Sequence, residues 1–383
     1  MSKFLPKIAN SVLFFLALSI LGCEKPEENV DNKTPVTIGV IGPFSGPDKG
    51  WGENGLLGVE TAIQLEKTQG NRHSLKIIKE DDQSNPKLTI AALDKLVRED
   101  QVSAVLVLSS SSSMLAIADL ADSYKTPIVS VLASHPDITG NHWVSQFIFD
   151  DVVQGNVAAL YVIDELFVDH VGVGRDENDP HGESLADHFV DRFKTAGGIT
   201  ERIDLTGDSV NYTDLVAQLR DKDLDFIYLP LQAAKVIEFE RAARQVGWNP
   251  QVMVSDGLLA VMMLEYEDDL PIIEGMLATD IFATEAEFTQ YGKRVSEIFK
   301  GSFKEPGTTI SALGCEATSA LITALQNCGN DPDKTCINLA LRGGNEFQGI
   351  LDPILIHRSG KAERPVFINT IENSKLQPVL RVN

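Results

Sequence analysis

From residue 36 onward, short apolar segments alternate with longer amphipathic ones, and this pattern constrains the fold more than any other feature of the chain. Short apolar runs predict buried strands, and the amphipathic segments predict helices. Alternating strands and helices predict a parallel sheet with helices on both faces. In the first series we expect strands at 36–41, 75–80, 102–108 and 127–132, and helices at 55–69, 86–99 and 114–121.

A second alternating series follows residue 150, after a short apolar segment at 147–149 that we expect to be a strand. A mature chain of about 360 residues is long enough for two packed cores, so we expect two domains. The second series predicts strands at 168–173, 225–229, 251–254 and 272–281, and helices at 154–166, 182–195, 214–220 and 235–246. Further helices are expected at 287–299, 310–326 and 335–342, and short strands at 353–356, 366–370 and 376–380.

Residues 1–22 have the organisation of an export signal. A pair of lysines precedes a mostly apolar stretch at 12–21. A membrane-spanning helix needs about 20 apolar residues, so we interpret 1–22 as a cleaved signal peptide. The sequence Ile20-Leu21-Gly22-Cys23 resembles a lipobox, in which Cys23 becomes acylated, with palmitate among the expected chains, and anchors the protein to a membrane of the cell envelope. The polar residues 23–35 are expected to be a tether.

Composition narrows the class of partner. The net charge of −22 disfavours nucleic acid and anionic lipid. Because an exported protein can form disulfides, we expect Cys328 and Cys336, which flank a loop between two helical patterns, to pair. Cys315 lies in an apolar helix and is expected to be a buried thiol. We expect no metal and no cofactor, because the cysteine spacing does not suit zinc and the acidic loop 176–179 lacks the spacing of a calcium loop.

Five consecutive serines, residues 109–113, stand between the expected strand 102–108 and the expected helix 114–121. The first turn of a helix has free backbone N–H groups and a partial positive charge. Serines there can cap the helix and add hydroxyl donors, so we expect this turn to hold a small anion such as a carboxylate. Ligands bind at the carboxyl ends of strands in open parallel sheets, and four more loops follow expected strand ends: 42–46, 133–134, 174–176 and 255–257.

Short motifs follow one another in a distinctive order: Ile38-Gly39-Val40-Ile41-Gly42-Pro43-Phe44-Ser45-Gly46, Trp51-Gly52, Glu80-Asp81-Asp82-Gln83-Ser84-Asn85-Pro86, the serine run, Gly182-Glu183-Ser184-Leu185, Asp225-Phe226-Ile227-Tyr228 and Ser255-Asp256-Gly257. Together they resemble the leucine/isoleucine/valine-binding family, the type I periplasmic binding proteins of branched-chain amino acid and amide uptake systems. The resemblance covers about residues 36–372.

The resemblance implies an α/β fold of two lobes joined by a hinge of three segments. Each lobe would be a mainly parallel sheet with helices on both faces. The ligand would lie between the lobes, and lobe closure would present a docking surface to a membrane permease. We expect lobe 1 at 36–150 and 279–358, lobe 2 at 151–278 and 359–383, and crossovers near 149–151, 278–279 and 358–362.

In the first lobe the resemblance implies five ligand contacts. Ser111 would hold the ligand carboxylate, with the carbonyl region of Ser109 beside it. Leu132 would offer its carbonyl to the ligand ammonium, and Ser134 would offer its hydroxyl. Trp51 would cover the ligand. Two simpler interpretations stay open, because the serine run can be only a capped helix start and Trp51 can be only packing between lobes.

In the second lobe the resemblance implies three contacts. Asp256, where the family often has glutamate, would pair with the ligand ammonium. His181 and Gln232 fall where the family often has tyrosine, and their hydrogen-bonding groups favour a polar ligand over an apolar branched-chain one. Each of the three has an alternative role: Asp256 as a turn former, His181 as a solvated loop residue and Gln232 as a helix cap.

The expected function is that of an extracytoplasmic, lipid-anchored solute-binding protein. It would deliver a small amino acid or amide-like solute to an ABC-type permease. We expect no enzyme, because the serines lack a Gly-x-Ser-x-Gly elbow and the chain has no phosphate loop or metalloprotease helix. A sensor or envelope-assembly lipoprotein with the same fold is the alternative, and neighbouring permease genes would distinguish the two.

Overall fold

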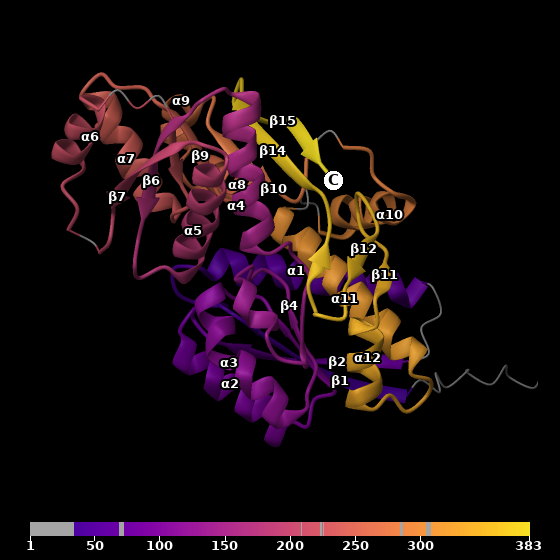
Figure 1. The fold of residues 1–383 in the computed structure, drawn as a ribbon. Coiled ribbons are helices and arrows are strands. Elements are labelled where there is room, and N and C mark those ends of the chain that lie inside the picture. The colour runs from indigo at the N-terminus through magenta and orange to yellow at the C-terminus, as the bar shows by residue number, and fades with distance from the viewer. Residues whose placement is uncertain are drawn as a thin grey trace, which may run out of the picture. The chain divides into compact units, whose positions relative to one another are not determined.

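The computed structural model describes residues 34–68, 73–207, 209–222, 224, 226–283, 286–303 and 308–383. The signal peptide, Cys23 and all but the last two residues of the expected tether lie outside this part of the chain. The described residues form three sheets with their helices (Figure 1).

The first sheet holds five strands, all parallel, in the order β2-β1-β3-β4-β5. Its strands are β1 (Thr34–Gly42), β2 (His73–Asp81), β3 (Ala104–Val107), β4 (Ile128–Ser130) and β5 (Val144–Gln146). One face packs against α1 (Lys49–Thr68), α11 (Thr309–Asn327) and α12 (Lys334–Arg342), and the other against α2 (Pro86–Arg98) and α3 (Ser111–Tyr124). Because helices cover both faces, all side chains of β3 and β4 are buried.

The second sheet holds seven strands in the order β15-β14-β10-β9-β8-β6-β7. Its parallel strands are β6 (His170–Arg175), β7 (Ile199–Asp204), β8 (Phe226–Leu229), β9 (Gln251–Val254) and β10 (Leu277–Asp280), and β14 (Val366–Glu372) and β15 (Lys375–Val382) are antiparallel. One face packs against α4 (Asp151–Leu160), the π-helix η2 (Tyr161–Glu165) and α5 (Pro180–Thr195). The other packs against α6 (Tyr212–Arg220), α7 (Ala233–Gln245), α8 (Leu258–Glu265) and α9 (Leu270–Ile273).

A small antiparallel sheet completes the first core. It consists of β11 (Asn345–Phe347), β12 (Ile354–Ile356) and β13 (Ala362–Glu363), and its apolar side chains join the core of the first sheet. We call the first sheet with these strands and its helices the first lobe, and the second sheet with its helices the second lobe. The remaining helices are η1 (Pro136–Thr139), η3 (Glu267–Asp269), α10 (Gln290–Ile298) and η4 (Phe299–Phe303).

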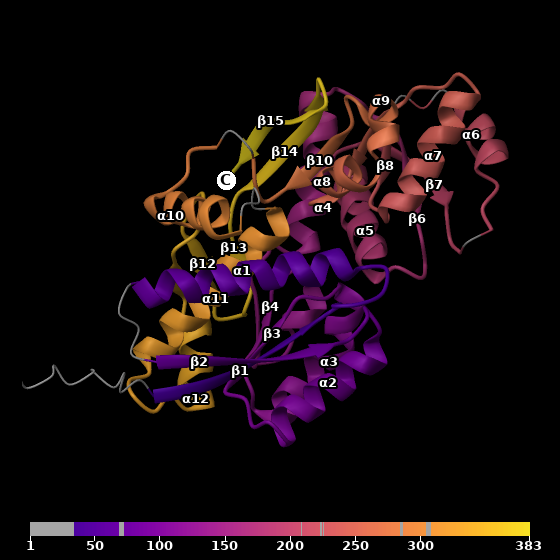
Figure 2. The same cartoon turned by 180° about the vertical axis from the view of Figure 1, so that it is seen from behind.

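Helices α1 and α11 pack against each other (Figure 2). The contact depends on glycine, because a Cβ atom at Gly58 would lie 2.1 Å from the carbonyl oxygen of Ser311. The reverse contact is similar, since a Cβ at Gly314 would lie 2.4 Å from the carbonyl oxygen of Gly55. Any larger residue at these positions would push the helices apart.

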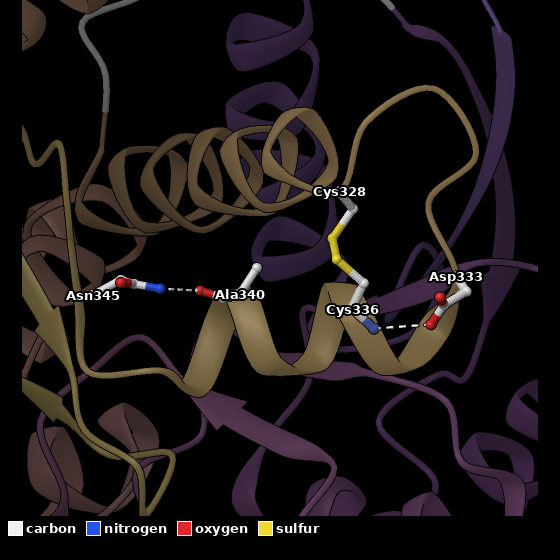
Figure 3. The surroundings of a disulfide bond; sticks show 5 residues. All are labelled: Cys328, Asp333, Cys336, Ala340 and Asn345. Atoms are coloured by element: carbon white, nitrogen blue, oxygen red, sulfur yellow. Dashed lines mark hydrogen bonds between the residues drawn. A yellow bond between two sulfur atoms is a disulfide. The ribbon is translucent and has the colours of Figure 1, made fainter.

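A disulfide joins Cys328, at the end of α11, to Cys336 in α12 (Figure 3). These are the two cysteines that the sequence pairs. The carboxylate of Asp333 caps α12 by accepting a hydrogen bond from the Cys336 amide at 2.9 Å. Cys315 is a buried free thiol, as its apolar helix predicts, and burial raises its pKa to about 12.

The chain passes between the two larger sheets at three places. It leaves the first sheet after β5, returns after β10 and leaves again between β13 and β14. Strand β10 ends at Asp280, so the second passage begins slightly later than the sequence places it. Strand β13 still pairs with β12, so the third passage also begins slightly later. The lobe limits drawn at 150, 278 and 358 stay predictions.

One predicted strand is wrong, and another is correct only over its second half. The segment 147–149 is buried but bends away from the sheet, and the strand is β5, just before it. The segment 272–281 begins with the short helix α9, and Gly275, with a φ of +80°, separates it from β10. The apolar side chains at 147–149 fill the core, although only the Phe147 amide bonds to the neighbouring strand, so composition alone was misleading.

Among the elements that were missed, two show why periodicity fails. Strand β7 is largely polar because it forms an edge of the second sheet, and α8 is apolar nearly all round, so neither shows the expected periodicity. Among the described residues, no helix has both the length and the apolar character needed to cross a membrane.

Candidate functional site

The predicted site residues follow the carboxyl ends of parallel strands. In the first lobe Trp51 follows β1, Ser109 and Ser111 follow β3, and Leu132 and Ser134 follow β4. In the second lobe His181 follows β6, Gln232 follows β8 and Asp256 follows β9. The carboxyl ends of parallel strands meet at one edge of a sheet, so each set shares an edge.

Three of these residues converge. The hydroxyl of Ser134, from the first lobe, lies 3.0 Å from Nδ1 of His181, from the second. Nε2 of the same imidazole lies 4.0 Å from a carboxylate oxygen of Asp256. A fourth residue, Asp151 in the first turn of α4, places a carboxylate oxygen 3.3 Å from Nδ1 of His181. The ring therefore lies between two carboxylates and bonds across the lobes.

The surroundings of His181 favour its charged form. Burial by itself would lower its pKa, but the close charge of Asp151 and the charges of Asp256 and Asp179 raise it to about 10. Burial would also raise the pKa of Asp151, but the charge of His181, 3.3 Å away, and the nearby polar groups of Ser134 and Ser184 hold it below its ordinary value. The pair is an imidazolium and a carboxylate at neutral pH.

Asp256 is held by a side chain of α4. One of its carboxylate oxygens accepts a hydrogen bond from the Gln154 amide at 2.8 Å, and the same amide nitrogen donates to the Thr279 hydroxyl at 2.6 Å. Burial raises the pKa of Asp256, opposed by His181 and Gln154 and reinforced by Asp151. The second lobe thus presents an excess of negative charge beside the Ser134 hydroxyl of the first.

The serine run is tied mainly to the interior of the first lobe. The Ser109 hydroxyl donates to Asp82 at 2.6 Å, the Thr89 hydroxyl donates to Asp82 at 2.9 Å, and the Ser113 hydroxyl lies 3.0 Å from the Thr89 oxygen. The N-cap of α3 is Ser110, but its side chain makes no capping hydrogen bond. The expected side-chain cap is therefore wrong, because neighbouring hydroxyls are recruited by the buried carboxylate instead.

The other candidates stand apart from the Ser134–His181–Asp256 group. Ser111 is the buried first residue of α3, and Leu132 packs against the core of the first sheet. Trp51 is half-buried in α1. Gln232 is exposed at the N-cap of α7, and its side chain makes no capping bond, so the alternative capping role is excluded.

Sequence reasoning missed Asp151, Gln154 and Asp280 at this site. Asp151 and Gln154 lie one turn apart at the start of α4, directly after the passage between sheets. Acidic and amide side chains inside an otherwise apolar helix start were the available signal. The sequence held no such signal for Asp280, because this residue lay inside a predicted strand.

The arrangement suits recognition of a small polar solute. Hydroxyls and a helix start in the first lobe can hold a carboxylate, and the carboxylates of the second lobe can hold an ammonium. In the part of the chain that the structure describes, no three His, Cys, Asp or Glu side chains gather as a metal site would require.

Comparison with known proteins agrees with this geometry. Residues 35–375 match the family described as "Periplasmic binding protein". An amino acid binding protein of Pseudomonas aeruginosa is 26% identical over 307 residues, covering 78% of this chain and 80% of the relative. The Leu/Ile/Val-binding protein of Escherichia coli is 26% identical over 249 residues, which cover 64% of this chain and 67% of the relative. The structure of a leucine binding protein from Thermotoga maritima superposes with a TM-score of 0.83 at 23% identity. The superposition covers 91% of this chain and 99% of the other.

The match spans nearly all of the described residues, and the related structure confirms the predicted fold of two mainly parallel α/β lobes. The relatives are solute-binding proteins, which confirms that this chain is not an enzyme. The chain therefore belongs to the periplasmic binding protein family, as its motifs predict.

Proposed function

We propose that this protein is an extracytoplasmic, lipid-anchored binding protein that captures a small amino acid or amide-like solute between its lobes and delivers it to an ABC-type permease. The hydrogen bond between Ser134 and the His181 imidazolium carries the proposal, because it brings side chains from the carboxyl edges of both sheets to one place beside Asp256. The names of the relatives, which include amino acid and Leu/Ile/Val-binding proteins, support the amino acid class.

The proposed clamp holds the two ends of a zwitterion. Ser111, the first residue of α3, and the α3 backbone amides would hold the carboxylate, and Asp256 would hold the ammonium. Ser109, Leu132, Ser134 and Trp51 would line the first-lobe side, and His181 and Gln232 the second-lobe side. The polar character of His181 and Gln232 favours amino acids with a hydrogen-bonding side chain.

A thermal-shift screen of residues 30–383 against the twenty proteinogenic L-amino acids, their amides, polyamines and aromatic acids tests the ligand class. A ligand present at 100 times its dissociation constant should add about 2.7 kcal/mol of stability. Each amino acid is compared with its analogue lacking the amine, for example L-leucine with 4-methylpentanoate. If no amino acid or amide shifts the transition, the ligand class is wrong, and the sensor or envelope-assembly role becomes the better explanation.

Substitution of the ammonium partner gives the sharper test. Asp256→Ala should weaken amino acid binding by about tenfold or more, because a charge-assisted hydrogen bond is lost. Calorimetry measures the affinity, and Asp191→Ala, at an exposed position of α5 outside the proposed contacts, is the matched control. Equal affinity of Asp256→Ala and the unmodified protein would exclude an ammonium at Asp256.

The lipid anchor has its own experiment. Full-length protein expressed in a bacterial host should lose residues 1–22 and carry acyl chains on Cys23, which intact-mass spectrometry detects. Cys23→Ser should leave the mass without acyl chains and release the protein from membranes. An unacylated Cys23 on the mature protein would contradict the anchor and leave the ligand proposal untouched.

A further inference from the structure

Asp280 is a buried carboxyl group at the junction between the site and the second passage between sheets. It is the last residue of β10, and its side chain is fully buried. One carboxylate oxygen accepts hydrogen bonds from the Ile281 amide at 2.7 Å and the Phe282 amide at 3.3 Å. Its other oxygen, Oδ2, is buried and has no hydrogen-bond partner among the described residues.

Asp280 and Asp256 lie at matching positions of neighbouring parallel strands, because each stands two residues after the paired residues Ala278 and Val254. The Gly257 amide, the next along the chain from Asp256, is close enough to help lower the pKa of Asp280. Thr279, the neighbour of Asp280 in β10, accepts from the Gln154 amide that also holds Asp256. Asp280 therefore follows the strand next to the one that leads to Asp256, and its carboxylate accepts from the amides of the passage.

The charges around Asp280 oppose each other. Burial and the negative charge of Asp256 raise its pKa to about 7, although the amides of Ile281, Phe282 and Gly257 lower it. Around Asp256 lie Asp151 from α4, the imidazolium of His181 from α5 and the Tyr228 hydroxyl from β8. On the other side, Arg364 lies over the ring of Phe282.

We propose that Asp280 is a positioning residue for Asp256 and that it loses its proton when a ligand ammonium binds there. The inference rests on the proposed function, because it requires a cationic group beside Asp256. An ammonium at this position adds positive charge near both carboxyl groups, which favours the ionised form of Asp280. The released proton passes to the buffer. Ionised Asp280 is the better acceptor for the Gly257, Ile281 and Phe282 amides and so fixes the Asp256 loop to the passage.

The sign of the pH dependence follows from linkage. Because binding releases a proton, affinity should rise with pH through about pH 7 and level off above it, where Asp280 is already ionised. At pH 7 the free protein should hold about half a proton on Asp280, which sets the upper limit of the release from this group.

Calorimetry with L-leucine as probe, or with the strongest binder among the twenty L-amino acids if L-leucine does not bind, measures this release. The observed heat at pH 7 is compared in phosphate and Tris buffers, whose ionisation enthalpies differ. The unmodified protein should release up to about half a proton. Asp280→Asn, which keeps one acceptor oxygen and cannot ionise, should release close to none and lose the pH dependence near pH 7.

Glu240→Gln is the matched control. Glu240 is buried in α7 of the same lobe, forms an ion pair with Arg244 at 3.2 Å, and has a pKa that burial raises to about 7. No ligand contact is proposed for it, so its loss should leave the proton release unchanged. The inference would be overturned if Asp280→Asn released as many protons on binding as the unmodified protein. It would also be overturned if Glu240→Gln lost as much proton release as Asp280→Asn. Either result would leave the proposed function intact.

A second measurement needs neither a variant nor a ligand. In the free protein, the backbone amide signals of Gly257, Ile281 and Phe282 should shift together in an NMR pH titration with a midpoint near pH 7. Signals that do not titrate between pH 5 and 9 would overturn the inference. If no amino acid binds in the first experiment, the proposed function and the ligand-linked release are overturned together.

Discussion

At the residue scale, His181 owes its charge to its neighbours. Its folded pKa of about 10 lies above the ordinary value of 6.5. A raised pKa means that the folded protein binds the proton more tightly than the unfolded chain does. The resulting stability is complete below about pH 6.5 and is lost as the pH rises through the folded value near 10.

This predicts a steeper loss of stability above neutral pH in the unmodified protein than in His181→Gln. Urea unfolding at intervals between pH 6 and pH 10 measures the free energy of unfolding of each. His357→Gln, at an exposed position outside the site, should follow the unmodified protein. Parallel curves for the unmodified protein and His181→Gln would show that the imidazolium does not form in the folded state.

Asp82 is a second buried acidic residue, and its carboxylate depends on neighbouring hydrogen-bond donors. Its fully buried carboxylate accepts hydrogen bonds from the hydroxyls of Ser109 and Thr89 and from the Ser84 amide. Asp82→Ala should lower the free energy of unfolding by about 2–4 kcal/mol, because buried donors would be left without partners. Asp119→Ala, on the exposed face of α3, is the control for denaturant unfolding. A loss below about 0.5 kcal/mol would mean that water replaces the carboxylate.

At the element scale, the disulfide between α11 and α12 closes a short loop. Loop-closure entropy predicts that Cys328→Ser with Cys336→Ser lowers the free energy of unfolding by about 2–3 kcal/mol. Reducing agent should produce a similar loss in the unmodified protein and none in the double variant. Cys315→Ala, which removes the buried free thiol, should keep the full response to reducing agent. A response in the double variant would point to another cysteine pair.

At the scale of the whole molecule, Arg364 connects all three passages between the sheets. It lies on the third passage, donates to the carbonyl of Phe147 on the first at 2.8 Å, and lies 5.6 Å from the ring centre of Phe282 on the second. It also pairs with the buried carboxylate of Glu316 in α11 at 3.0 Å. A single guanidinium therefore fixes the region about which the lobes are expected to move.

Arg364→Ala should lower the free energy of unfolding by about 3–5 kcal/mol, because Glu316 would remain buried without its counter-ion. Arg358→Ala, at an exposed position of the same segment, should change it by less than about 0.5 kcal/mol. Chemical denaturation of both variants gives the comparison. Equal stability of the two would show that Glu316 is accommodated without Arg364.

Much of the fold could be read from periodicity, because a helix and a strand repeat their apolar side chains at different intervals. Strand β9 and helices α2, α5 and α11 were predicted to within about two residues, the usual limit at element ends. Elements that are apolar on every face, such as α8, and the polar edge strand β7 could not be recognised in this way.

The sequence by itself determined the alternation of strands and helices, the family and the loops where a ligand would be sought. These depend on local spacing and on short motifs, which survive in one dimension. Only the tertiary structure decided that Asp151, Gln154 and Asp280 surround Asp256, that Ser109 faces Asp82, and that His181 is charged. A side chain's charge and partners depend on burial and on neighbours far along the chain, and those are established only when the two sheets fold.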